Sequence, residues 1–150
     1  MSVTINFVTV AASIANLSIQ GVKILDAGSI PTSLGTQVRV LQPRPRRFVT
    51  NFRLVPVEQT RQNLNAYYTL NYNYYYAAVG GGLPEFKVYA PMLNDIAAIA
   101  VAFAKVGTLS GATDNSTPKI GDIAAIQDNA GNLYHGCEIS IDILQFLEES

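Results

Sequence analysis

The sequence is poor in the residues that most often carry chemistry. Its 150 residues include one cysteine, Cys137, one histidine, His135, and no tryptophan. A lone cysteine excludes an intramolecular disulfide and a cluster of thiolate ligands, and a histidine-dependent site would have to be built around His135 by itself. Residues 80–82 are three glycines, but no Lys–Ser or Lys–Thr pair follows them to complete a phosphate-binding loop. We therefore predict that the protein is not an enzyme and has no cofactor and no metal.

Charge is also scarce. Charged residues make up 14% of the chain and hydrophobic residues 49%, whereas about a quarter of an average domain is charged. The longest apolar run, Ile96–Ala104, is nine residues, and a membrane span needs roughly 20. No basic region precedes an apolar stretch at the amino terminus, so no signal peptide is expected. These features favour a surface that is buried against other subunits over one that is buried in a membrane.

The few charges are unevenly distributed. Residues 1–84 hold seven basic and two acidic side chains, a net charge of +5, and residues 85–150 hold three basic and nine acidic ones, a net charge of −6. This division predicts a subunit that presents opposite charge on different faces.

Hydrophobic periodicity predicts one α+β domain over residues 1–150, an antiparallel or mixed β-sheet flanked by two helices with a C-terminal β-hairpin. The first helix is expected over residues 4–20, before Gly21, and the second over residues 91–106, with Pro91 in its first turn. The expected strands are 37–41, 48–57, 66–79, 120–127 and 133–147, the last two joined by a turn at 128–132.

Two further expectations concern irregular segments. Residues 107–119, rich in Gly, Ser, Thr and Asn, are expected to form a flexible loop. In the last strand, Leu144 and Phe146 break the alternation of inward and outward side chains, which predicts a bulge or a strand end there.

The second predicted helix is apolar on nearly all sides. A stripe of large residues defines one side, but Ala98, Val101 and Ala102 make other sides apolar too. One sheet covers only one side of a helix. We therefore expect a neighbouring subunit to cover these three residues.

The strand at 66–79 is rich in tyrosine. Tyr68, Tyr72 and Tyr74 alternate on one face, and polar side chains occupy most of the other. Such a stripe would serve either as a platform on which bases or sugars stack, or as part of a packed core. The second arrangement is the more common one.

An arginine- and proline-rich segment precedes it. Prolines 43 and 45 keep the backbone extended, while guanidinium groups grip carboxylates or phosphates through two hydrogen bonds. The acidic half of the chain supplies carboxylates, so we expect the segment to lie at a subunit interface, with nucleic-acid binding as the alternative. The arginines concerned are Arg39, Arg44, Arg46 and Arg47.

The order of elements resembles that of the tail terminator (tail-completion) proteins of long-tailed bacteriophages, or of a related neck protein. The resemblance covers most of the chain: a helix within 8–20, strands within 37–57 and 66–79, a helix at 91–106 and a closing hairpin. In that hairpin, Ile126-Gln127-Asp128-Asn129-Ala130-Gly131-Asn132 leads into Cys137-Glu138-Ile139-Ser140-Ile141-Asp142-Ile143.

The resemblance implies a structural virion protein located in the tail or neck, and in the host cytoplasm during assembly. Such proteins form a hexameric ring that caps the tail tube, stops its polymerisation and joins the tail to the head connector. DNA passes through the ring without specific binding, and no membrane is involved. An acidic lumen would let DNA slide, so four acids are expected to face the channel or the neighbouring ring: Asp122, Asp128, Glu138 and Asp142.

Overall fold

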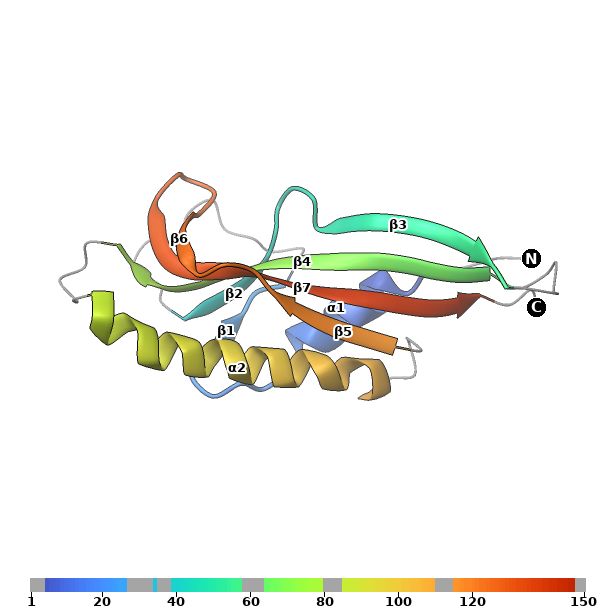
Figure 1. Ribbon diagram of the computed structural model, residues 1–150, viewed down its shortest axis with the longest axis horizontal. Coiled ribbons are helices and arrows are strands. Elements are labelled where there is room, and N and C mark those ends of the chain that lie inside the picture. Colours follow the sequence, from blue (N-terminus) through green and yellow to red (C-terminus); the bar gives the residue numbers. More distant parts are fainter. Residues whose placement is uncertain are drawn as a thin grey trace.

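The computed structural model describes residues 5–26, 34, 39–57, 64–79, 85–109 and 115–147. These residues form a seven-stranded mixed β-sheet and two helices (Figure 1), the α+β architecture predicted from the sequence. The predicted C-terminal hairpin is confirmed: β6 (Ala124–Gln127) and β7 (Leu133–Leu147) pair antiparallel. Gly131, with a φ of 86°, supplies the left-handed position of the connecting turn.

Two long antiparallel strands, β4 (Leu64–Ala78) and β7, form the centre of the sheet. Shorter strands follow one another along their outer edges. β2 (Val40–Pro43) and β3 (Val49–Pro56) both pair with β4, and β5 (Asn115–Ile120) and β6 both pair with β7. The order is therefore β3-β4-β7-β5 at one end. At the other end β1 (Lys23–Ile24) adds a parallel strand beside β2.

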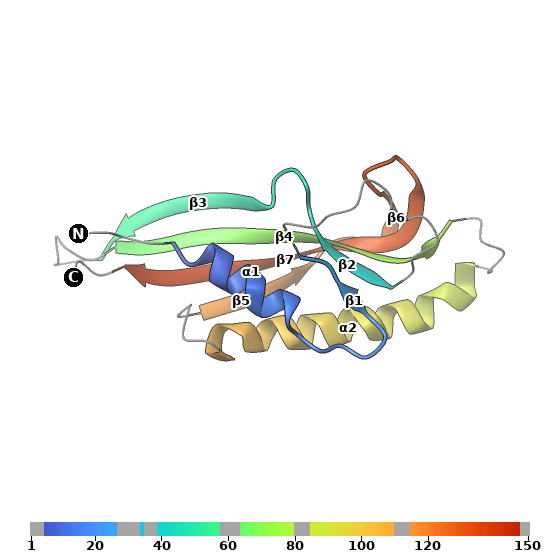
Figure 2. The same cartoon turned by 180° about the vertical axis from the view of Figure 1, so that it is seen from behind.

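The two helices, α1 (Phe7–Ala15) and α2 (Glu85–Leu109), lie on the same face of the sheet (Figures 1 and 2). The main core fills the space between them and the sheet. Its largest contributions come from the tyrosine stripe of β4, where the ring of Tyr72 meets that of Phe103 with 5.3 Å between centroids. The other buried members include Val10, Ile14, Tyr68, Leu70, Tyr74, Met92, Ile99, Cys137, Ile139, Ile141 and Ile143.

The opposite face, here called the helix-free face, is mostly polar along β4 and β7. A small second core covers only its β6 end and consists of Leu34, Val40, Tyr75 and Tyr134. There the rings of Tyr75 and Tyr134 meet edge to face, with 5.5 Å between centroids. The sheet therefore buries one face along its length and the other at one end.

Several predicted boundaries were wrong. α2 begins at Glu85, before Pro91, which lies inside the helix. A proline removes one backbone hydrogen bond of a helix, and Pro91 is on the exposed side of α2, where a carbonyl group without that bond remains open to solvent. The first helix ends at Ala15 instead of residue 20.

By length and composition alone, Lys87–Lys105 is able to span a membrane; in this fold, 33% of that segment is buried.

Two other corrections concern the sheet. Part of the predicted loop at 107–119 is strand β5, because Asn115–Ile120 pairs with β7; residues 110–114 lie outside the described residues. The predicted break at Leu144–Phe146 is also wrong, since β7 pairs regularly as far as Leu147. The register shift lies instead in β4, between Tyr75 and Ala77. Of the predicted strand at 37–41, residues 37 and 38 are outside the described residues.

Candidate functional site

Arg39, the first of the predicted interface arginines, is used within the chain. It precedes β2 with a left-handed φ of 57°, and its Nε and Nη2 donate to the Asp95 carboxylate of α2 at 2.8 Å each. Nη2 also donates to the carbonyl of Gln20 at 3.0 Å, and the Tyr74 hydroxyl donates to the same carboxylate. This cluster, Arg39–Asp95–Tyr74, ties α2 to the sheet and to the segment after α1.

The electrostatics of the cluster follow from its contacts. Burial disfavours the Asp95 carboxylate, but hydrogen bonds from Arg39 and Tyr74 outweigh burial and lower the pKa of Asp95. The hydrogen bond to Asp95 raises the pKa of Arg39. Gly21 leaves room for the Arg39 guanidinium, because a Cβ at this position would lie 2.0 Å from Arg39 Nη1.

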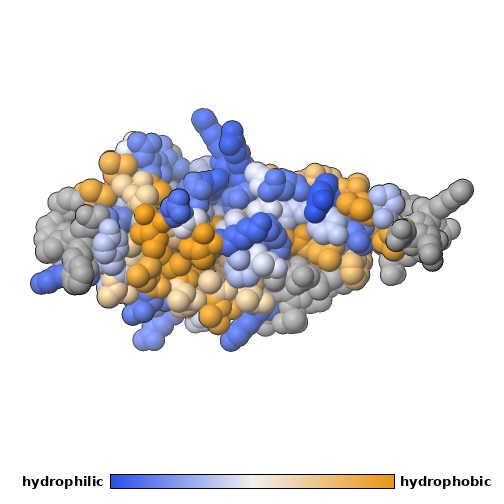
Figure 3. All heavy atoms as spheres, in the orientation of Figure 1, coloured by the Kyte–Doolittle hydropathy of each residue, from blue (hydrophilic) through white to orange (hydrophobic). Residues whose placement is uncertain are grey.

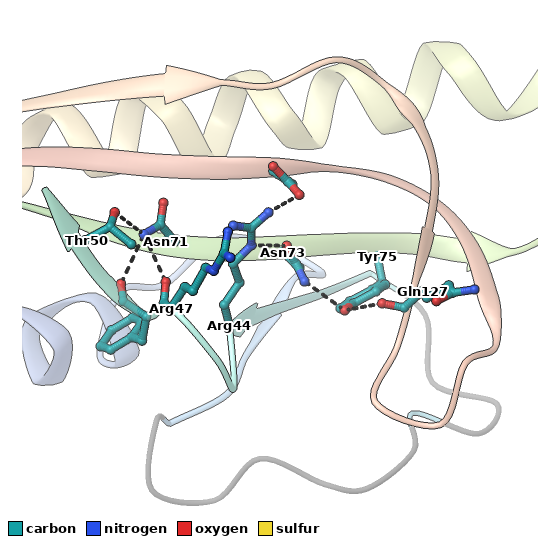
Figure 4. Close-up of polar contacts among 9 residues, drawn as sticks. Arg44, Arg47, Thr50, Asn71, Asn73, Tyr75 and Gln127 are labelled. Carbon is teal, nitrogen blue, oxygen red and sulfur yellow. Dashed lines mark hydrogen bonds and ion pairs between the residues drawn. The ribbon is translucent and has the colours of Figure 1, made fainter.

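Arg44 is also paired within the chain. Its Nη2 forms an ion pair with Glu138 of β7, and its Nε donates to Asn73 Oδ1 at 3.2 Å (Figure 4). Two further hydrogen bonds extend this network. Asn73 Nδ2 donates to the Tyr75 hydroxyl at 3.1 Å, and the Tyr75 hydroxyl donates to the Gln127 carbonyl at 3.0 Å. Arg44 thus stabilises one side of the helix-free face.

Two ion pairs join the oppositely charged halves of the sequence. Arg39 pairs with Asp95 and Arg44 pairs with Glu138, so the basic half of the sequence folds against the acidic half. The reason is the topology: β4 places the β2–β3 segment close to the outward side chains of β7.

The other two predicted arginines, Arg46 and Arg47, are exposed in the loop between β2 and β3. Arg47 has a left-handed φ of 61°. Asn71 of β4 holds this loop, because its Nδ2 donates to the Arg47 carbonyl at 3.0 Å and to Thr50 Oγ1 at 2.8 Å. We did not select Asn71 from the sequence, although asparagines alternating with tyrosines signalled a polar face there.

The four predicted channel acids occupy different environments. Asp128 is buried, and its carboxylate accepts hydrogen bonds from the backbone N–H groups of Ala130 and Asn132 at 2.9 Å and of Leu34 at 3.2 Å. Burial acts against the charge, but these bonds lower the pKa of Asp128. Asp128 therefore stabilises the β6–β7 turn, and its carboxylate is directed to these backbone groups instead of to a channel. Asp122 is exposed between β5 and β6.

Asp142 and Glu138 do share the helix-free face, but each has a cationic partner. Lys119 Nζ lies 2.6 Å from Asp142 Oδ2, and the Thr69 hydroxyl donates to Asp142 Oδ1 at 2.7 Å. Beside them, the Arg53 guanidinium lies 4.3 Å from the centroid of the Tyr67 ring. A hollow of about 460 Å³ opens here, lined by Asn51, Phe52, Arg53, Tyr67, Tyr68, Thr69, Lys119, Asp142 and Ile143.

The three predicted interface residues of α2 lie on the side turned away from the sheet. Ala98 and Val101 are exposed, the latter by 57%, and Ala102 is half-buried. Together with Leu17 and Ile19 they line a groove of about 530 Å³ between α2 and the segment after α1. The structure thus brings the three residues together on an open apolar surface.

Strand β3 lies within the strand predicted over residues 48–57, but its exposed apolar side chains were not among the predicted site residues. Within the described residues it pairs only with β4, and seven of its eight residues are exposed. Four of them are large and apolar: Val49, Phe52, Leu54 and Val55. In the sequence, these four residues alternate irregularly with Thr50, Asn51 and Arg53. β5 likewise pairs only with β7.

Neither the cysteine nor the histidine of the chain lines the hollow beside Arg53. Cys137 is fully buried, and burial raises the pKa of its thiol to about 12. His135 is half-buried on β7. Among the described residues, no group of three or more His, Cys, Asp or Glu side chains could hold a metal ion.

Comparison with known proteins identified no relative: no family model, no curated protein and no solved structure matches the chain.

Proposed function

We propose that the protein is a structural subunit that assembles with copies of itself, edge to edge, into a ring. In line with the resemblance to tail terminators, we further propose that this ring caps a phage tail tube, stops its polymerisation and joins the tail to the head connector. A related neck protein is the nearest variant of this proposal.

One observation carries the self-assembly step: within the described residues, β3 and β5 each pair with another strand on one side only, so the order β3-β4-β7-β5 ends on each side in a strand without a second strand partner. β3, β4, β7 and β5 alternate in direction, since each neighbouring pair is antiparallel. β3 and β5 therefore run in opposite directions. When β3 of one copy lies beside β5 of the next, the alternation continues from copy to copy without a parallel pair.

The side chains of β3 favour such a contact. Exposed edge strands normally carry charges, prolines or bulges that prevent pairing with other chains; β3 has one charged residue, Arg53, a proline at its end, Pro56, and a register shift between Thr50 and Arg53. Phe52 is 53% exposed and Leu54 is 46% exposed. Burial of apolar surface contributes about 25 cal/mol per Å², so covering these side chains would stabilise an assembly.

The geometry of the contact favours a closed or helical array. β3 and β5 are different surfaces, so the interface is heterologous, and heterologous interfaces generate rings when the rotation closes. In such a ring, α1 and α2 would lie on one side of the sheet and the helix-free face on the other. The open groove beside Val101 would then contact a neighbouring copy or the adjoining tail protein.

The alternative, a module that binds nucleic acid or carbohydrate by stacking on the tyrosine stripe, is not favoured. Tyr68, Tyr72 and Tyr74 are at most 1% exposed. An aromatic side chain that is enclosed by the core offers no face on which a base or sugar could stack.

Electron microscopy of the protein alone and with self-assembled tail-tube protein of the same phage tests the proposal. We expect rings in end-on views, and tubes that carry one ring at an end and stop growing. Leu54→Lys should abolish rings and capping, because a charge on β3 opposes edge pairing. Lys87→Gln, on α2, is the matched surface control. Tubes that grow equally long with and without the protein would contradict the terminator role.

A further inference from the structure

The helix-free face has more cations than acids. Glu138 is paired with Arg44, and Asp142 with Lys119. Arg53 rests on the Tyr67 ring. Figure 4 shows the Arg47 side chain extending over β4 toward the Arg44 guanidinium. Within the described residues, no carboxylate forms an ion pair with Arg47 or Arg53.

These cations follow β4 along its length. Arg44 contacts Asn73, the Arg47 loop is held by Asn71, Lys119 joins the Asp142 carboxylate beside Thr69, and Arg53 lies over Tyr67. Asn73 and Tyr67 are six positions apart, which corresponds to roughly 20 Å of strand. A row of this length would contact several phosphates of a nucleic acid, because each strand of a duplex has one phosphate per ~3.4 Å of helix axis.

The hollow beside Arg53 lies at one end of the row. Its volume, about 460 Å³, is in the range of sites that hold small ligands. The Tyr67 ring supports the guanidinium and leaves N–H groups available for two hydrogen bonds to one phosphate. Thr69 and Asn51 add polar groups to the lining.

We propose that the helix-free face binds the phosphate backbone of nucleic acid, with Arg47 and Arg53 as its principal contacts. The charges of Glu138 and Asp142 do not oppose this binding, since each is offset by its own partner. Base recognition is not involved, because the tyrosines of the stripe are buried on the other face. The site belongs to a single chain and does not require the ring.

Fluorescence anisotropy with a labelled 20-base oligo(dT) and a labelled 20-base-pair duplex tests the proposal at several salt concentrations. We expect the double variant Arg47→Gln/Arg53→Gln to bind at least tenfold more weakly at low salt. The slope of log affinity against log salt should fall by about 1.8 for the duplex, since each phosphate contact contributes roughly 0.9. The matched control is Lys87→Gln/Lys105→Gln, which removes two cations from α2. It should leave the affinity at low salt and the salt slope unchanged.

Three results would overturn the proposal: no binding by the unmodified protein at low salt, an unchanged slope in the arginine variant, or an equal loss in the lysine control. Circular dichroism of each variant verifies that the fold is retained. Sedimentation of the same samples reports their oligomeric state, so a failure of phosphate binding is distinguished from a failure of ring assembly.

Discussion

At the scale of single residues, the Arg39–Asp95–Tyr74 cluster connects segments that are far apart in the sequence. It joins four segments, because Arg39 precedes β2, Asp95 is in α2, Tyr74 is in β4, and the Gln20 carbonyl follows α1. The Asp95 side chain is 11% exposed. A carboxylate at this depth needs its partners, since an unsatisfied buried charge is costly.

We predict that Asp95→Asn lowers the free energy of unfolding by about 2 kcal/mol, the cost of losing hydrogen bonds to a charged group. Urea unfolding measures this change. The matched control is Glu138→Gln, whose pair with Arg44 is more exposed and should cost less than about 1 kcal/mol. Equal effects of the two changes would contradict the central role of the cluster.

The same carboxylate predicts a pH dependence. The pKa of Asp95 is lower in the folded chain than its ordinary value of 3.8, so its contribution to stability is complete above about pH 4 and decreases as the pH falls through the folded pKa. Stability measured between pH 6 and pH 2 should therefore fall less steeply in Asp95→Asn than in the unmodified protein. Identical slopes would rule out this contribution.

Gly136 permits the close approach of β7 to β4. A Cβ there would lie 1.9 Å from the Tyr74 carbonyl oxygen, so Gly136→Ala must displace backbone. We expect a loss of more than about 3 kcal/mol, or failure to fold. Gly131→Ala is the comparison, since no atom lies within 4 Å of its Cβ and only the positive φ, costing about 1 kcal/mol, opposes it. Thermal unfolding distinguishes the two, and a mild effect at Gly136 would contradict this packing.

At the scale of elements, the sequence predicted what local patterns determine. Alternation identified β4 and β7, and the turn residues 128–132 identified the hairpin between β6 and β7. The polar segment at 115–120 looked like a loop because β5 forms through long-range pairing with β7, which composition does not encode. Pro91 suggested a helix start, but packing of α2 on the sheet outweighed the cost of an internal proline.

Candidate site residues were harder to predict than strands. The sequence suggested Arg39 and Arg44 as residues of a subunit interface, whereas both bind carboxylates of their own chain. Their partners could not be predicted, because they depend on how β4 brings the two halves of the chain together. Asp128 was misjudged for a similar reason: its carboxylate is enclosed by its own turn and by Leu34.

The two sides of α2 should respond differently to charge. Ile99 is buried against the sheet and Val101 is 57% exposed. We predict that Ile99→Asp unfolds the protein, whereas Val101→Asp changes monomer stability by less than about 0.5 kcal/mol, as surface substitutions do. Val101→Asp should instead weaken contacts between copies. Circular dichroism and sedimentation measure both effects, and a Val101→Asp protein that unfolds like Ile99→Asp would show that the chain itself covers this side.

At the scale of the whole molecule, the sheet is long and its two faces differ (Figures 1 and 2). One face carries both helices and the main core, and the other is largely polar. Figure 3 shows apolar side chains on the surface between the β6 end of the sheet and α2, and hydrophilic ones projecting above the middle of the molecule. Together with β3 and β5, which within the described residues each pair with a strand on one side only, these features favour assembly of the protein with copies of itself.

The mass of the protein in solution tests this claim most directly. Native mass spectrometry and sedimentation over a wide range of protein concentrations should detect one discrete oligomer of the unmodified chain, and a monomer for Leu54→Lys. A folded monomer at every concentration, with the same behaviour for the unmodified chain and Leu54→Lys, would contradict edge-to-edge assembly.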